Sequence, residues 1–109
     1  MAAPRVELLW WSGCPSHGKA RTMPQAALTE AGLDPTGMET LQVVTEEEAA
    51  QEGFVGSPAI RINGTDIVAP DDQPPALTCR LYVRRDGRPG PLPDPADLRD
   101  ALAAALTRS

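Results

Sequence analysis

Several features are scarce in this sequence, and each scarcity excludes a class of protein. Lysine and arginine form no run and the formal net charge is −5, so the clustered cations of a nucleic-acid surface are missing. No apolar run approaches the ~20 residues that a membrane-spanning helix needs. The first residues, MAAPRVE, lack the apolar stretch of a secretory signal peptide. We therefore expect a cytoplasmic protein that binds neither nucleic acid nor membrane.

Cysteine is also scarce, because only Cys14 and Cys79 are present and they lie far apart in the chain. In a reducing compartment, such a pair is more typical of catalysis, redox chemistry or metal binding than of a structural disulfide. The chain has 109 residues, of which 41% are apolar. This length and composition predict one globular domain, residues 1–109, with an ordinary core.

The richest stretch is VELLWWSGCPSHG, residues 6–18, where an apolar run ends and Cys14 and Pro15 open a segment with helical spacing. Pro15 suits the first position of a helix, because its φ is fixed and its missing N–H would have no partner there. Cys14 would then lie beside backbone N–H groups at the positive end of a helix dipole, which favours a thiolate. His17, one turn further on, could pair with that thiolate or transfer protons.

A plainer interpretation of these two residues stays open. Buried cysteines are often inert, so Cys14 could be a small apolar residue of the core. His17 would then be a solvated residue on the surface of its helix.

Hydrophobic periodicity and turn residues predict alternating strands and helices. Strands are expected at residues 5–11, 38–44, 59–62, 65–68 and 77–83, and helices at 15–31, 45–52 and from 95 onward. Thr45 begins a capping box, Asn63-Gly64 is a strong hairpin signal, and Asp94 is placed to cap the last helix. Residues 69–75 are predicted to form a polar loop, 84–88 a solvated hairpin tip and 89–93 a coil.

The predicted order β-α-β-α-β-β-α, with a cysteine at the first strand–helix junction, resembles the thioredoxin fold. Residues 14–17, Cys-Pro-Ser-His, stand in the place of the C-x-x-C motif, and Ser57-Pro58 looks like the cis-proline that faces the active cysteine. Residues 54–60 followed by Asn63-Gly64 are similar to the glutaredoxin pattern of that region. The resemblance implies an α/β, thioredoxin-like three-layer sandwich, in which a mixed β-sheet is flanked by helices, and a cis Ser57–Pro58 bond.

The chain departs from the dithiol pattern because His17 replaces the second cysteine, which would resolve a mixed disulfide. Cys14 would then need an external thiol, as monothiol glutaredoxins do, or Cys79. The predicted Asn63-Gly64 hairpin would return the chain to the end of the sheet where Cys14 lies, which makes Cys79 a candidate. Burial of Cys79 on a face of the sheet is the structural alternative.

The first functional hypothesis is thiol–disulfide chemistry without a cofactor or metal. Cys14 would attack the disulfide of a partner protein or exchange with a low-molecular-weight thiol. Trp11 would form a wall of the site, and Ser57-Pro58 would present its backbone to an extended substrate.

Two further hypotheses come from other functional classes. The chain also resembles small bacterial thioredoxin-fold proteins sometimes labelled alkylmercury-lyase-like, although it contains no full lyase motif. Cys14 and Cys79 would then bind a soft metal or an organomercurial, with Asp71 or Asp72 as proton donor, because thiolates favour soft metals. The third hypothesis is a non-catalytic thioredoxin-fold module.

Overall fold

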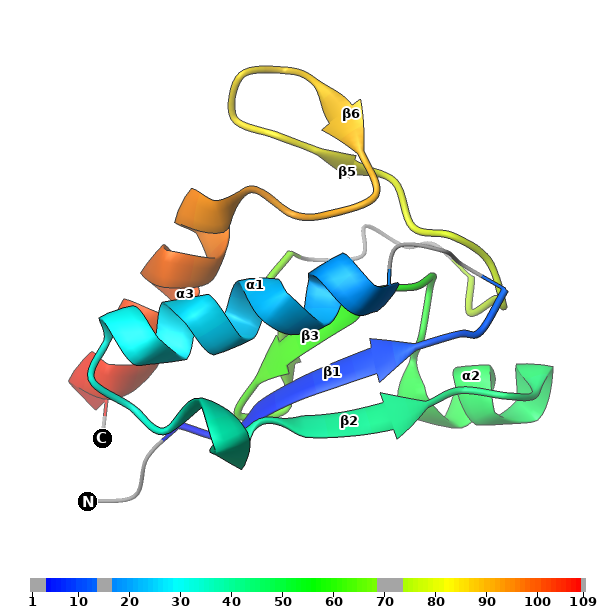
Figure 1. Cartoon of the computed structure of the whole chain (residues 1–109). Coiled ribbons are helices and arrows are strands. Elements are labelled where there is room, and N and C mark those ends of the chain that lie inside the picture. Colours follow the sequence, from blue (N-terminus) through cyan, green and yellow to red (C-terminus); the bar gives the residue numbers. More distant parts are fainter. Residues whose placement is uncertain (1–3, 14–16, 69–73, 109) are drawn as a thin grey trace.

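The computed structural model describes residues 4–13, 17–68 and 74–108, and within them it is a mixed α/β structure (Figure 1). Three α-helices accompany a four-stranded mixed sheet and a separate two-stranded ribbon. The strands are β1 (Val6–Trp10), β2 (Glu39–Gln42), β3 (Ala59–Ile62), β4 (Thr65–Asp66), β5 (Tyr82–Val83) and β6 (Pro89–Gly90). The helices are α1 (His17–Glu30), α2 (Glu46–Glu52) and α3 (Pro95–Arg108), with a short 3-10 helix, η1, at Pro35–Gly37. The α/β class predicted from the sequence is confirmed.

The four-stranded sheet has the order β2-β1-β3-β4, so β1 is central. It pairs in parallel with β2 and antiparallel with β3, and β3 pairs antiparallel with β4. A central strand is covered on both faces, which explains why Leu8 and Leu9, whose side chains point to opposite sides, are both buried.

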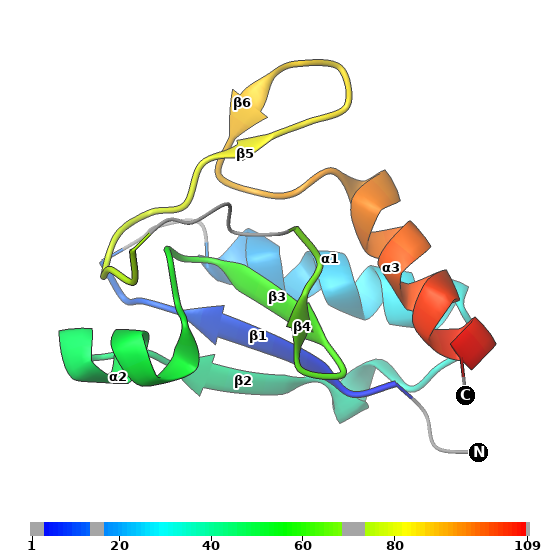
Figure 2. The same ribbon diagram turned by 180° about the vertical axis from the view of Figure 1, so that it is seen from behind.

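Helices lie on both faces of this sheet, and each face has its own hydrophobic cluster. On one face, α1 and α3 lie side by side over β1 and β3 (Figures 1 and 2). Their cluster is Val6, Leu8, Ala20, Ala27, Leu28, Ile60, Ile62, Leu98, Leu102 and Ala105. On the other face, α2 covers one end of the sheet with a smaller cluster, made of Leu9, Val43, Ala49, Phe54 and Ala59.

The cap predicted for α2, the start predicted for α3 and the turn predicted between β3 and β4 are confirmed. Thr45 caps α2, because its side chain accepts a hydrogen bond from the N–H of Glu48, and Gly53 ends the helix at φ 66°. The Asp94 side chain accepts a hydrogen bond from the N–H of Ala96 at 2.9 Å, at the start of α3. Residues 63 and 64, Asn-Gly, turn the chain between β3 and β4 with φ of 53° and 81°.

The second half of the predicted sheet is shorter than expected. The strand predicted at 65–68 ends at Asp66, because the Asp66 side chain accepts a hydrogen bond from the N–H of Val68 and turns the chain. The strand predicted at 77–83 is wrong except for Tyr82 and Val83. Its only other ladder contact among the described residues is a single bridge between Cys79 and Ser57. The coil predicted at 89–93 begins with β6, which pairs with β5.

None of the helices in the described residues has both the length and the hydropathy that a membrane span requires.

Candidate functional site

The candidate site begins where β1 ends. The N–H of Trp11 donates a hydrogen bond to the Ser57 Oγ at 3.0 Å, and Ser57 is completely buried. The Trp11 side chain is partly buried and packs against the cluster under α2. Its ring also covers the backbone of Gly13, because a β-carbon at Gly13 would overlap the ring. The Trp11 ring and the backbone of Gly13 therefore lie against each other just beyond the end of β1.

The second part of the site is the segment that leads into β3. The Ser57–Pro58 peptide bond is cis, as the sequence analysis predicted. Gly56 precedes it at φ 150°, a conformation that favours glycine. A β-carbon at Gly56 would lie 2.9 Å from the Arg80 Cα, so glycine also allows a close approach between two backbones.

That neighbouring backbone is the segment that contains Cys79. The N–H of Ser57 donates to the Thr78 carbonyl at 2.7 Å, and the N–H of Arg80 donates to the Ser57 carbonyl at 2.8 Å. These two bonds form a parallel bridge between Ser57 and Cys79. Ser57 is thus bonded to Trp11 through its side chain and to the Cys79 segment through its backbone. We call this meeting point of residues 11–13, 56–58 and 78–80 the Ser57 junction.

Cys79 is exposed in this structure, so the alternative that it is buried on a sheet face is wrong. Side chains alternate along residues 79–83. Cys79, Leu81 and Val83 are exposed, whereas Arg80 and Tyr82 are buried. Cys79 therefore lies on the exposed side of the segment.

The buried side chains of this segment form a polar cluster that the sequence analysis missed. Arg80 Nη1 lies 2.5 Å from the Asp66 Oδ2, and Nη2 donates to the Val68 carbonyl at 2.7 Å. The Arg80 guanidinium also lies 4.6 Å from the centre of the Tyr82 ring. The Tyr82 hydroxyl donates to the Pro58 carbonyl at 2.6 Å. Burial is the main cause that raises the pKa of Tyr82, so the hydroxyl stays protonated and remains a donor.

Residues 79–83 alternate between two faces of an extended segment, and this alternation is visible in the sequence. Judged by apolar character alone, however, the sequence predicts burial of the face that is exposed in the structure. Cysteine, leucine and valine are expected inside and arginine outside. Here the order is reversed, because the carboxylate of Asp66 and the carbonyl of Val68 satisfy the Arg80 guanidinium. Buried ions are tolerated when they are paired in this way.

Part of the predicted site lies outside the described residues. Cys14, Asp71 and Asp72 lie outside the described residues, and His17 is described by its backbone, as the first residue of α1. The structure does bring together Trp11, Ser57, Pro58 and Cys79, which lie far apart in the sequence. Among the residues that the structure describes, no group of three or more His, Cys, Asp or Glu side chains is arranged to hold a metal ion.

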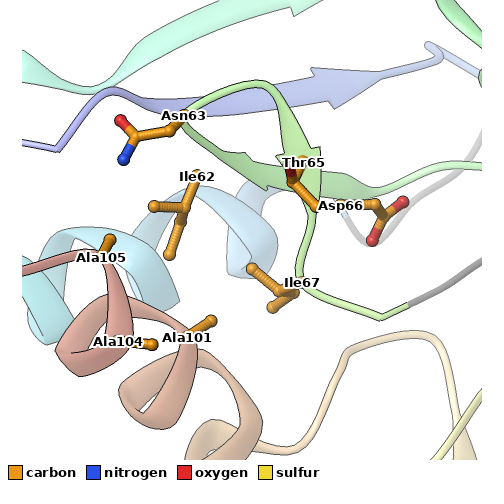
Figure 3. Close-up of a pocket in the computed structure, with 8 residues that line it drawn as sticks. All are labelled: Ile62, Asn63, Thr65, Asp66, Ile67, Ala101, Ala104 and Ala105. Atoms are coloured by element: carbon orange, nitrogen blue, oxygen red, sulfur yellow. The ribbon is translucent and has the colours of Figure 1, made fainter. Parts of the chain in front are cut away.

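A separate hollow of about 240 Å³ lies at the opposite end of the sheet, between the β3–β4 hairpin and α3 (Figure 3). Ile62 and Ile67 point toward α3, and Asn63 and Asp66 point away from it (Figure 3). The α3 wall consists of the small residues Ala101, Ala104 and Ala105. The residues that line the hollow include neither cysteine nor histidine, and its Asp66 is the residue that pairs with Arg80 of the Ser57 junction.

Comparison with known proteins finds no match for this chain, since no family model, no curated protein and no solved structure matches it.

Proposed function

We propose that this chain is a thioredoxin-like protein that carries out thiol–disulfide exchange, with Cys14 as the nucleophile and Cys79 as the resolving thiol. The observation that carries the proposal is that Ser57 forms hydrogen bonds to two segments, to Trp11 on one side and to residues 78 and 80 on the other. The order of strands and helices, and the presence of helices on both faces of the sheet, support the thioredoxin-like part.

Chain connectivity extends this argument from the junction to Cys14. The Cα atoms of Gly13 and Cys14 are one peptide unit apart, about 3.8 Å. Gly13 lies under the Trp11 ring, and the Trp11 N–H is bonded to Ser57. Cys79 bridges to the same serine from the other segment. Cys79 therefore lies in one of the segments that Ser57 joins, and Cys14 follows the other segment directly in the sequence.

The proposed reaction balances as two successive exchanges. The Cys14 thiolate attacks one sulfur of a substrate disulfide, and the substrate S–S bond breaks to release the other sulfur as a thiolate. The Cys79 thiolate then attacks the Cys14 sulfur, which releases the second substrate thiolate and forms a Cys14–Cys79 disulfide. The substrate gains two electrons, and the protein dithiol loses them. A dithiol or two molecules of a small thiol would reduce the protein again.

The decisive experiment is peptide mapping of the whole chain after mild oxidation with oxidised glutathione. We expect one intramolecular Cys14–Cys79 disulfide in the native chain and a stable glutathione adduct on Cys14 in Cys79→Ser. Cys14→Ser should lose exchange with a disulfide substrate. Thr78→Ser, which keeps both thiols, is the matched control and should behave like the native chain.

Two results would contradict the proposal in different ways. If Cys14 is capped by glutathione while Cys79 stays reduced, the chain is a monothiol exchanger and the resolving role of Cys79 is wrong. If the pKa of the Cys14 thiol, measured by thiolate absorbance, equals or exceeds the ~8.5 of free cysteine, the nucleophile itself is wrong.

A further inference from the structure

The buried polar cluster behind Cys79 takes no direct part in the proposed exchange, yet it is attached to both sides of the Ser57 junction. Arg80 and Tyr82 are buried at 7% and 3% exposure, and they flank the exposed residue Leu81. A buried guanidinium is costly unless it is paired and hydrogen-bonded. In this chain the Arg80 guanidinium is paired and hydrogen-bonded, so its contacts can position the segment that carries it.

The contacts of Arg80 fix the segment to the sheet. Its guanidinium bonds to the Asp66 carboxylate in β4 and to the carbonyl of Val68, at 2.5 and 2.7 Å. The guanidinium is planar and its donors have a fixed geometry, so two acceptors on one turn of chain define where the Arg80 backbone lies. Cys79 is the residue immediately before it.

The hydrogen bond of Tyr82 fixes the segment that contains Ser57 and Pro58. Its hydroxyl donates to the Pro58 carbonyl at 2.6 Å, in a buried position. The Arg80 guanidinium lies over the Tyr82 ring, so the two side chains hold each other. Pro58 follows Ser57, whose carbonyl and N–H are bonded to the two neighbours of Cys79. A continuous series of contacts therefore links β4 to Pro58 through the side chains of Arg80 and Tyr82.

We infer that Arg80 and Tyr82 are positioning residues that hold the Cys79 thiol in place relative to the segment before Cys14. This inference rests on the proposed function, because it assigns the geometry of the resolving step. Arg80 acts through the backbone of Cys79, and Tyr82 acts through the Pro58 carbonyl.

The test measures the equilibrium constant of the Cys14–Cys79 disulfide against glutathione, with alkylation after acid quenching and quantification by mass. Tyr82→Phe removes only the hydroxyl, and we expect the constant to fall about fivefold, the effect of one lost buried hydrogen bond. Arg80→Lys keeps the charge but loses the planar pair of donors, and the constant should fall about tenfold.

Leu102→Val is the matched control, because Leu102 belongs to the cluster under α1 and α3 and not to the junction. It should lower the melting temperature while the disulfide constant stays within about twofold of the native value, as independent sites predict. A residue that only stabilises the fold would behave like this control. Equal constants in the native chain and in Tyr82→Phe would therefore overturn the inference, even if Tyr82→Phe melts at a lower temperature.

A second measurement separates failure of this inference from failure of the proposed function. In a Cys14→Ser background, the rate of Cys79 alkylation is followed against pH with and without Tyr82→Phe. Positioning predicts that the substitution changes the rate or moves the midpoint of the profile, by about threefold or more in rate, since Cys79 reactivity depends on its surroundings. If the native chain forms no disulfide, an altered profile still supports positioning and an unchanged profile overturns it.

Discussion

At one end of the sheet, the Asn63-Gly64 turn closes the β3–β4 hairpin through its own backbone conformation. At the other end, the Ser57 junction is held by hydrogen bonds to Trp11, Thr78 and Arg80, which are distant in sequence. The hairpin end is encoded in two adjacent residues, so it can be recognised and changed locally. The junction end depends on three segments that must arrive together, so a change in one segment should disturb the other two.

The largest effect is expected from removing the core beneath the junction. Phe54 is 1% exposed and packs with Leu9 and Val43 under α2, close to the segment that leads to Ser57. Phe54→Ala should lower the free energy of unfolding by about 4 kcal/mol, because it removes buried surface and leaves a cavity. Urea unfolding followed by tryptophan fluorescence measures this loss.

Ile62→Val at the hairpin end is the matched control for that substitution. It trims a buried side chain of the other cluster by one methyl group and should cost about 1 kcal/mol. If Phe54→Ala lowers the free energy of unfolding no more than Ile62→Val does, the cluster beneath the junction contributes little to stability.

The two glycines, one at each end, provide the most direct comparison. Gly56→Ala should cost about 3 kcal/mol, because its β-carbon would lie 2.9 Å from the Arg80 Cα and its φ is 150°. Gly64→Ala should cost only about 1 kcal/mol, since nothing lies within 4 Å of its β-carbon and only its φ of 81° is unfavourable.

Denaturant titration of both glycine variants measures the difference, and alkylation of Cys79 shows whether the junction has moved. Faster or slower alkylation is expected in Gly56→Ala and not in Gly64→Ala. Equal losses of stability would mean that the Arg80 segment shifts away from Gly56 at little cost, and that the junction is loosely held.

A smaller loss is expected when the hydroxyl at the junction is removed. In Ser57→Ala, the N–H of Trp11 loses the oxygen that accepts its hydrogen bond at 3.0 Å. The unfolding free energy should fall by about 1.5 kcal/mol, which is typical of a partly buried donor left without its partner. Thr29→Val removes a hydroxyl whose bond to the Gln25 carbonyl lies on an exposed helix face, so it should change stability very little. Calorimetry that finds the same change in both variants would argue against a structural role for the Ser57 hydroxyl.

The same contrast explains how much of the molecule the sequence could predict. Caps and turns such as Thr45 and Asn63-Gly64 act over a few residues, so their signals are complete in the local sequence. The apolar residues on both faces of β1 agree with its central position in the sheet. The cis bond at Ser57–Pro58 was predicted through the resemblance to the thioredoxin fold.

The remainder depends on partners that the local sequence does not specify. A strand over 77–83 was expected from apolar and β-branched residues, but most of it lacks the long ladder that a strand needs. Arg80 was not foreseen as a buried residue, because its burial requires an aspartate fourteen positions away. The accessible side of Cys79 follows from that burial, since the two residues alternate along an extended chain.

The smallest expected effect concerns the ribbon beyond the junction, whose tip, residues 84–88, is exposed as predicted. Arg85 at this tip also binds α3, because its side chain pairs with Asp97 and Asp100 and its N–H donates to Asp94 at 2.9 Å. The N–H groups of Arg85 and Ala96 hold the pKa of Asp94 below its usual range. A lowered pKa in the folded state means that the charged form stabilises the fold.

The pH dependence of that stabilisation has a definite sign. It is fully present above the unfolded-state pKa of an aspartate, about 3.9, and is lost as the pH falls through the lower pKa of the folded state. Asp94→Asn removes the charge, so the native chain should melt a few degrees above the variant at neutral pH, and the difference should shrink as the solution becomes more acidic than about pH 4. Calorimetric melting across that range measures the difference. A difference that stays constant with pH would show that the amide of the variant replaces the carboxylate fully, and that the ribbon is held to α3 by Arg85 and its other two partners.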